Sequence, residues 1–368
     1  MQYEILQQGL VTQCEPGSAT ALACGPRVVV TSRGEVLCSY MVHPALGVNG
    51  FKPKISRSSD GGATWHEQGL IWPDLQHSHS IFGSISLAPD GTLFFFGSRT
   101  PIEQPGEKFW CESTNGIKQN ELVFAQSADE GATWTEPKLV PMMISGSAEA
   151  PGPMCIMRSG RWVCCYSPYN TFDSAVTVDR NQVVCLSSGD QGETWAQTSM
   201  LRFADKNSFA AEAWVIELSD GRLLGAAWHS NEIPGAGLPN AYAISQNGGL
   251  TWSPTASTGI RGQSSALAAL SDGRALFIYN QRQHGEIGVW LAVARPTETD
   301  FGIEANAIIW HAERATRNGT SSDFSNWTDY SFGEPSITLL PDGNLLATLW
   351  YARADSSGIQ YVKLSRPA

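Results

Sequence analysis

The amino-acid sequence predicts an all-β fold, a six-bladed β-propeller that forms a single domain over residues 1–368. Three observations support this prediction: the composition, a hairpin signal that occurs six times, and a second turn motif that occurs four times. Only 16% of the residues are charged, whereas 36 are glycine, 20 are proline and 13 are tryptophan. A composition of this kind is typical of many short strands joined by tight turns.

The hairpin signal is a short turn containing glycine between two apolar runs. Residues 215–218 and 223–226, for example, are apolar runs on either side of the turn 219–222. The six turns lie at 32–35, 89–92, 158–161, 219–222, 271–274 and 341–344. Glycine supplies the positive φ that a tight hairpin needs. Six units over the chain leave about 61 residues for each, which is enough for one four-stranded blade.

The sixth unit ends in the apolar run 359–364 and lacks a fourth strand. We expect residues 3–6 to supply that strand and close the ring, which removes the open sheet edges. No linker or low-complexity tract divides the chain. Residues 100–120 and 312–332 are the longest irregular insertions, and we expect them to form rims over a site.

The second motif, Ser-x-Asp/Asn-x-Gly-x-Thr-Trp, begins at Ser58, Ser127, Ser188 and Ser245. Its Asp or Asn side chain is expected to accept hydrogen bonds from turn amides, its Thr and Trp to begin the next strand, and its Trp to cover the core. The motif resembles the Asp-box of sialidases and their relatives. Both the pattern and the resemblance favour a structural role on the outer side of a blade.

The resemblance to the sialidase superfamily extends over nearly the whole chain. It implies a six-bladed propeller that cleaves a terminal acidic sugar, with three arginines on the sugar carboxylate, a Tyr–Glu pair that supplies the nucleophile, and an Asp as general acid. Arg27 matches the setting of the first arginine, and Glu212 that of the glutamate. Arg282 falls near the third arginine, and Tyr330 near the tyrosine.

The sequence departs from that pattern at three places. The Asp that acts as general acid is expected within residues 47–54, but this stretch contains no carboxylate. Trp228 and His229 stand where the second arginine should follow. Glu334 lies where the family usually has no carboxylate.

The innermost strands of a propeller line its central channel. An alignment of the six units therefore shows which side chains reach one mouth of the predicted channel. The predicted site residues at these strand starts and exits are Arg27, Arg261, Arg282, Arg353, Glu149, Glu212, Glu334, His79, His229, Tyr166 and Trp228. The strand exits also include His43, Tyr169, Asn170 and Trp350. Charged groups seldom gather unless they are paired or in use, so the set indicates a binding site or bridges between blades. Clustered arginines suit an anion, and the aromatic rings suit sugar faces.

Three functions are compatible with these residues. The first is a sialidase-like exo-glycoside hydrolase acting on an oligosaccharide or glycoconjugate with a terminal acidic sugar. Glu212 and Glu334 would then be base partner and acid, and Glu212 would activate Tyr330 as nucleophile. If Tyr330 is remote, the two carboxylates alone remain possible.

The second function is a lyase that acts by β-elimination on a uronic-acid glycoside. Its base would be His79, His229 or Tyr166, and its cation Arg261 or Arg282. The surplus of histidine and the missing Asp favour this alternative. The third function is a non-catalytic sugar-binding propeller whose mouth charges pair with one another.

Composition also excludes several classes. The net charge of −11 argues against a nucleic-acid partner, and no apolar stretch is long enough to span a membrane. We expect no cofactor and no metal, because the eight cysteines form no CxxC pair and no nucleotide-binding motif occurs. Residues 1–6 lack the features of a secretion signal, which predicts a cytoplasmic protein, or a secreted one if a signal has been removed.

Overall fold

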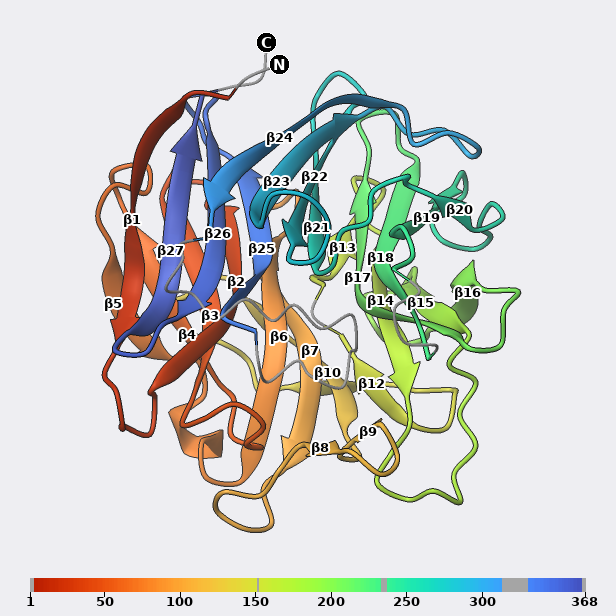
Figure 1. Cartoon of the computed structure of the whole chain (residues 1–368), viewed down its shortest axis with the longest axis horizontal. Coiled ribbons are helices and arrows are strands. Elements are labelled where there is room, and N and C mark those ends of the chain that lie inside the picture. The colour runs from red at the N-terminus through yellow and green to blue at the C-terminus, as the bar shows by residue number, and fades with distance from the viewer. Residues whose placement is uncertain (1–2, 151, 233–236, 313–329, 366–368) are drawn as a thin grey trace.

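The computed structural model describes residues 3–150, 152–232, 237–312 and 330–365. Within these ranges the chain folds into six antiparallel sheets set radially around one axis (Figure 1). The predicted six-bladed β-propeller is therefore confirmed. The single helical element described, the 3-10 turn Pro73–Leu75, is far too short to cross a membrane, and no other described segment forms a membrane-spanning helix.

Each blade runs from an innermost strand at the axis to an outermost strand at the rim. Blade 1 comprises β2 (Leu22–Val30), β3 (Val36–His43), β4 (Lys52–Ser58) and β5 (His66–Leu70), and blade 2 comprises β6 (His79–Leu87), β7 (Leu93–Pro101), β10 (Glu121–Ser127) and β11 (Lys138–Val140). Blade 3 has a divided inner strand, β12 (Ser147–Glu149) and β13 (Cys155–Ile156), followed by β14 (Trp162–Tyr169), β15 (Gln182–Ser188) and β16 (Ala196–Arg202).

The remaining blades complete the ring. Blade 4 comprises β17 (Ser208–Glu217), β18 (Leu223–Asn231), β19 (Ala241–Ser245) and β20 (Ala256–Ser257), and blade 5 comprises β21 (Ser265–Ala269), β22 (Ala275–Gln281), β23 (Gly288–Ala294) and β24 (Ile303–His311). Blade 6 comprises β25 (Phe332–Leu339), β26 (Leu345–Ala352), β27 (Ser357–Leu364) and β1 (Ile5–Cys14).

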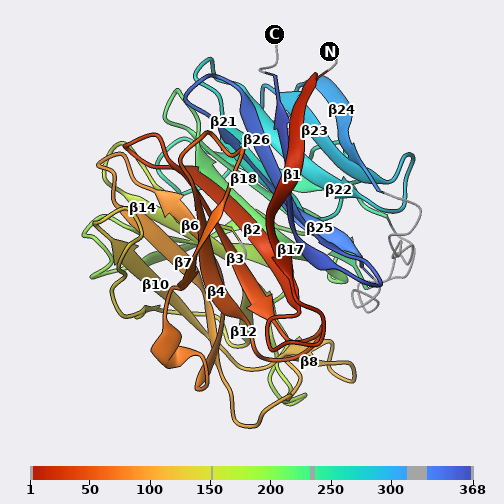
Figure 2. The same cartoon turned by 90° about the vertical axis from the view of Figure 1, so that its left-hand side faces the viewer.

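Strand β1 closes the ring as predicted. It pairs antiparallel with β27, from Ile5 opposite Leu364 to Cys14 opposite Ser357, and so forms the outer edge of the last blade (Figure 2). The backbone N–H of Ser365 donates to the carbonyl of Glu4 at 2.9 Å and continues the pairing. The strand is longer than residues 3–6, because its register with β27 extends to Cys14.

The predicted turns and boxes lie at two fixed places in the blades. Each of the six turns joins an innermost strand to the second strand, and its glycine has φ between 81° and 90°. Each of the four boxes joins the third strand to the fourth. In the first box, Asp60 Oδ1 accepts the N–H of Thr64 at 2.9 Å, and Oδ2 accepts its hydroxyl at 2.6 Å. Because both groups of Thr64 are bound in this way, Thr64 and Trp65 close the turn and β5 begins only at His66.

The boxes also join neighbouring blades. A Cβ on Gly62 would lie 3.0 Å from Leu346 in blade 6, and a Cβ on Gly131 would lie 3.3 Å from Leu37 in blade 1. The tryptophans at 65, 134, 195 and 252 pack against four different apolar clusters. The boxes therefore stabilise the rim, which agrees with their predicted structural role.

A candidate active site in the mouth of the propeller

A pocket of about 210 Å³ opens where the innermost strands begin and the second strands end. Cys24, Ser80, Glu149, Glu212 and Glu334 reach it from five different blades, and Ser264 just before β21 reaches it from the sixth. We call this the mouth pocket. A second cavity of about 260 Å³, the channel, is lined only by residues of the innermost strands and the segments next to them.

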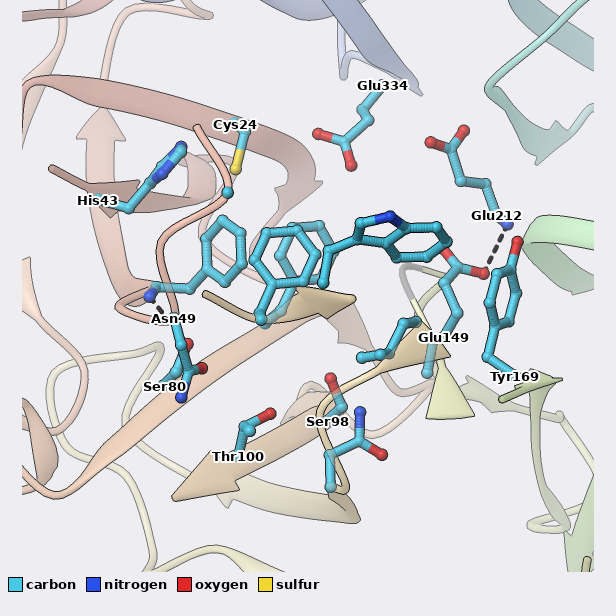
Figure 3. A pocket seen from close by; sticks show the side chains of 18 of the residues that line it. Cys24, His43, Asn49, Ser80, Ser98, Thr100, Glu149, Tyr169, Glu212 and Glu334 are labelled. Carbon is cyan, nitrogen blue, oxygen red and sulfur yellow. Dashed lines mark hydrogen bonds between the residues drawn. The ribbon is translucent and has the colours of Figure 1, made fainter. Parts of the chain in front are cut away.

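Three half-buried glutamates line the mouth pocket, as Figure 3 shows. Glu212 and Glu334 both lie at bulges, where the register shifts between Ala211 and Trp214 and between Gly333 and Ser336. Their φ angles of 52° and 44° are in the left-handed region, which few residues other than glycine adopt. Such strained positions occur mainly at functional sites, where the surrounding structure holds them in place.

Hydrogen bonds between blades hold these bulges. Glu149 Oε2 accepts the backbone N–H of Glu212 at 2.7 Å, and Glu334 Oε2 accepts the backbone N–H of Gly25 at 2.7 Å. Gly25 occupies the equivalent bulge of blade 1 and has φ 58°. A carboxyl group of one blade thus caps the backbone of the next.

Burial dominates the electrostatics of the three carboxyl groups. Burial, followed by the charge of Glu334, raises the pKa of Glu212 to about 7, although Ser264, Arg282 and Arg27 act in the opposite direction. Burial and then the charge of Glu212 raise the pKa of Glu149 well above its usual range. Burial also raises the pKa of Glu334, against the influence of Arg27. Carboxyl groups with such shifts can exchange protons near neutral pH.

Glu212 also has an unsatisfied oxygen. Its Oε2 atom is buried and has no hydrogen-bond partner within the described ranges. A buried carboxylate oxygen without a donor is costly, so this atom is suited to carry a proton or to receive one from a bound molecule.

Arg282 and Tyr330 lie together at the same pocket. The guanidinium Nη1 of Arg282 donates to Gln263 Oε1 at 2.9 Å, and Nε and Nη2 donate to the carbonyl of Phe332. Gln263 in turn donates to the hydroxyl of Tyr330 at 3.4 Å. Arg282 was predicted at the mouth, whereas Tyr330 was suggested by the family resemblance alone and its distance was left open; both line the mouth pocket.

The opposite wall is aromatic. Phe51 contacts Phe82 and Phe109, with ring centres 5.2 and 5.3 Å apart. Phe109 and Trp110 come from the predicted rim insertion, which contains the small hairpin β8 (Trp110–Cys111) and β9 (Gly116–Ile117). The other predicted rim, residues 312–332, lies outside the described residues at 313–329.

Hydrogen bonds hold the rim insertion over the pocket. Asn49 donates to Glu107 Oε1 at 2.6 Å, and Lys118 Nζ donates to the same oxygen at 2.7 Å. Asn49, Phe51, Phe82, Phe109 and Trp110 were not predicted as site residues. The insertion at residues 100–120 was a signal for Phe109 and Trp110 alone, and nothing in the sequence pattern indicated the other three.

Of the predicted site residues, six line the mouth pocket: Glu149, Glu212, Glu334, Arg282, Tyr330 and Trp228. Arg27 does not, because it lines the channel beneath it. Its Nη1 donates to the carbonyls of Pro26 at 2.7 Å and Glu334 at 3.1 Å, and its guanidinium lies 5.0 Å from the Trp214 ring centre. The bulge at Gly25 shifts the register and moves Arg27 along the axis.

The expectation that five further residues lie at the pocket is corrected by the structure. Tyr166 is fully buried in the apolar cluster that contains Phe96 and Leu186. His79 does not line the pocket, and its Nδ1 atom lies 2.9 Å from Ser78 Oγ. His229 is stacked on Phe203 at 4.3 Å and shares a small separate cavity with Arg261, where burial lowers the pKa of His229 to about 4. Arg353 lies 5.2 Å from the ring centre of its neighbour Tyr351.

Among the described residues, no group of three or more His, Cys, Asp or Glu side chains is arranged to hold a metal ion. The acid–base groups that line the mouth pocket are the three carboxyl groups, Tyr169, Tyr330, Cys24 and His43. Burial lowers the pKa of His43 to about 4, so this imidazole is neutral at physiological pH.

Comparison with known proteins gives one matching family. A family model described as "BNR repeat-like domain" matches residues 54–345. A curated sialidase of Bacteroides fragilis (strain YCH46) is 26% identical over 246 residues. The match covers 62% of this chain and 42% of that relative, so the chain spans less than half the length of the relative.

Solved structures with the same fold are more distant in sequence. A protein of unknown function from Dyadobacter fermentans is 19% identical with a TM-score of 0.76, over 99% of both chains. The NanB sialidase of Streptococcus pneumoniae is 18% identical with a TM-score of 0.66, over 97% of this chain and 70% of that one. An α-L-arabinanase of Penicillium chrysogenum is 14% identical with a TM-score of 0.65, over 98% of both chains.

Proposed function

Because this chain belongs to the BNR repeat-like domain family of sialidase-type propellers, we propose that it is a glycoside hydrolase that releases a terminal sugar in the mouth pocket. One observation carries the proposal. Glu212, a buried carboxyl group with an unsatisfied oxygen and a pKa of about 7, lines the same pocket as Tyr330 and Glu334. A base, a nucleophile and an acid are the groups that double displacement at an anomeric carbon requires.

The proposed reaction has two steps. Glu212 takes the phenol proton as the Tyr330 oxygen attacks the anomeric carbon, while Glu334 gives its proton to the departing oxygen of the glycosidic bond. Water then attacks the glycosyl–tyrosine bond and gives one proton to Glu334, and Glu212 returns its proton to Tyr330. Two inversions retain the configuration of the released sugar. The raised pKa of Glu334 suits the acid, because it keeps the proton available near neutral pH.

The terminal sugar has two candidate classes. An acidic, sialic-type sugar is supported by the names of the relatives and by Arg282 at the pocket. A neutral sugar is supported by the local charges. Arg282 already donates to the backbone carbonyl of Phe332, and it lines the mouth pocket together with three glutamates. A substrate carboxylate then meets no surplus positive charge among the described lining residues.

The lyase alternative is less well supported by the positions of its bases. His79, His229 and Tyr166 do not line the mouth pocket, and Arg261 lies in the separate cavity. The proposal therefore stays with hydrolysis, and elimination becomes an outcome of the test.

The test is incubation with oligosaccharides capped by sialic acid, by a uronic acid or by a neutral sugar, read by mass and ultraviolet absorbance. Hydrolysis adds the mass of water across the products and gives a free sugar. Elimination gives an ultraviolet-absorbing product with no added water, and would replace the proposal by the lyase. Loss of turnover in Glu212→Gln and in Tyr330→Phe, without loss of thermal stability, would assign the activity to this pocket.

A further inference from the structure

Glu149 contacts the proposed base through the backbone. It ends the short strand β12 in blade 3, and its Oε2 accepts the N–H of Glu212 from blade 4 at 2.7 Å (Figure 3). Glu212 has the left-handed φ of 52° at this point. A glutamate with a left-handed φ needs support from its surroundings, and this hydrogen bond satisfies its backbone N–H.

The same arrangement, a side chain of one blade bonded to the backbone N–H at the bulge of the next, recurs elsewhere in the ring. The contact between Glu149 and Glu212 is therefore part of a repeated pattern. Glu334 caps the N–H of Gly25 at the blade 1 bulge. The bulge at Glu334 has an equivalent partner in Asn280. When the side-chain amide of Asn280 is flipped, its oxygen accepts the N–H of Glu334 at 3.2 Å. In each case a side chain of the preceding blade holds the bulge of the next.

The charges around Glu212 favour an uncharged Glu149. The titratable or charged groups around Glu212 include Glu149 of β12, Glu334 of β25, Arg27 of β2, Arg282 after β22, Tyr169 of β14, and Tyr330, which lines the same pocket. Arg27 and Arg282 both act on Glu212, whereas Arg27 acts on Glu149 less strongly than the neighbouring glutamates do, so a negative charge on Glu149 would be poorly balanced in a buried site. Burial and the charge of Glu212 raise the pKa of Glu149 well above its usual range, in agreement with a protonated group.

We propose that Glu149 is a positioning residue that stays protonated and, by accepting the N–H of Glu212, fixes the left-handed bend that directs the Glu212 carboxyl group into the mouth pocket. The inference rests on the proposed function in that it takes Glu212 as the base of the reaction. Glu149 itself need not touch the substrate. What matters is its acceptor oxygen and its lack of charge.

Three variants separate these properties. Glu149→Gln keeps an acceptor oxygen and is uncharged, whereas Glu149→Ala removes the acceptor. Glu217→Ala is the matched control, because Glu217 Oε2 accepts the N–H of Arg158 at 2.9 Å, a carboxyl-to-amide bond between blades at the other end of β17. We expect Glu149→Gln to retain kcat within about threefold and Glu149→Ala to lose about tenfold or more, the effect of one lost hydrogen bond at a buried site. Glu217→Ala should leave kcat unchanged.

The pH profile distinguishes positioning from a general structural role. The acidic limb of kcat/KM should coincide in the wild type and in Glu149→Gln, because no charge is removed. A shift of this limb to lower pH in Glu149→Gln would mean that Glu149 is ionised and would overturn the proposal. Equal kcat for Glu149→Ala and the wild type would overturn it as well.

An infrared titration of glutamate carboxyl groups tests the inference without substrate. The protonated carboxyl band of Glu149 should be present in the wild type at neutral pH and missing from Glu149→Gln, while the bands of other protonated carboxyl groups remain. The band of Glu212, identified by its absence from Glu212→Gln, should titrate near pH 7 in the wild type and in Glu149→Gln. In Glu149→Ala the band of Glu212 should titrate at a different pH from that in the wild type. If this pattern holds while no glycoside is cleaved, the proposed function fails and the positioning role of Glu149 stands. If the pattern is absent while glycosides are cleaved, the reverse is true.

Discussion

The guanidinium carbon of Arg282 lies 4.0 Å from the centre of the Tyr330 ring. Arg282 is almost completely buried, and its donors bind Gln263 and the carbonyl of Phe332. A cation over an aromatic ring favours negative charge that develops on the phenol oxygen. The position of Arg282 therefore suits activation of a tyrosine nucleophile better than capture of a substrate carboxylate.

We expect Tyr330→Phe to reduce kcat by at least about 100-fold, because it removes the attacking oxygen and keeps the ring beneath Arg282. The matched control is Tyr279→Phe, which removes another buried hydroxyl, bonded to Asn306 in blade 5. Steady-state kinetics and thermal melting of both variants test the prediction. Turnover of Tyr330→Phe equal to that of the control would exclude Tyr330 as nucleophile.

The activity should depend on pH through Glu212. A base must be ionised, and burial raises the pKa of Glu212 to about 7, so kcat/KM should rise with pH up to about that value. Glu212→Gln should lose activity at every pH. A wild-type profile that is flat between pH 4.5 and 7 would contradict the assignment of Glu212 as base.

The same group should lower stability at higher pH. The pKa of Glu212 is about 7 in the folded protein and 4.5 as its ordinary value. Between these values the folded state holds a proton that the unfolded state has lost, so the free energy of unfolding falls as the pH rises. Above pH 7 the free energy of unfolding is lower by up to about 3 kcal/mol than it would be if Glu212 kept its ordinary pKa.

Glu212→Gln removes this cost. Its gain in unfolding free energy over the wild type should therefore be larger above pH 7 than at pH 4.5. Denaturant unfolding at the two pH values measures the difference. A gain that does not change with pH would mean that Glu212 is not the titrating group.

The Asp-box should affect stability alone. Trp65→Ala removes an aromatic side chain that packs against the apolar cluster of blades 1 and 6, and should lower the free energy of unfolding by about 1 to 3 kcal/mol. KM should not change, because the box lies at the rim. A rise in KM without any loss of stability would argue against the structural interpretation.

The aromatic wall should contribute to substrate binding. Phe109→Ala removes one ring of the wall and should raise KM by about tenfold with a smaller change in kcat. Phe172→Ala is the control, because Phe172 is 41% exposed and does not line the mouth pocket. Similar kinetics for the two variants would show that the wall does not contact the substrate.

The fold could be predicted in detail because its signals are local. Each glycine turn and each box depends on residues within one short segment, as in the bonds from Asp60 to Thr64. Repetition then gave the number of blades. The glutamates at 149, 212 and 334 were placed in the mouth for the same reason, since each lies at the start of an innermost strand or its bulge.

Other site residues depend on structure that one sequence does not reveal. Tyr166 and Tyr169 are three positions apart on β14, and side chains alternate between the two faces of a strand. Tyr169 therefore lines the mouth pocket whereas Tyr166 lies in the apolar cluster. Arg27 was misplaced because a bulge shifts the register, and Phe109 and Trp110 were missed because their position depends on the path of an insertion. Neither feature follows from periodicity.

The pairing of β1 with β27 has a consequence for synthesis of the chain. Ile5–Cys14 is synthesised long before its partner Ser357–Leu364. Until Ser357–Leu364 has emerged from the ribosome, β1 has an unpaired edge and the ring cannot close. The sixth blade is therefore completed only after β27 has been made. A truncation of β27 would leave β1 without its partner, so the loss of a late segment would cause an early one to misfold.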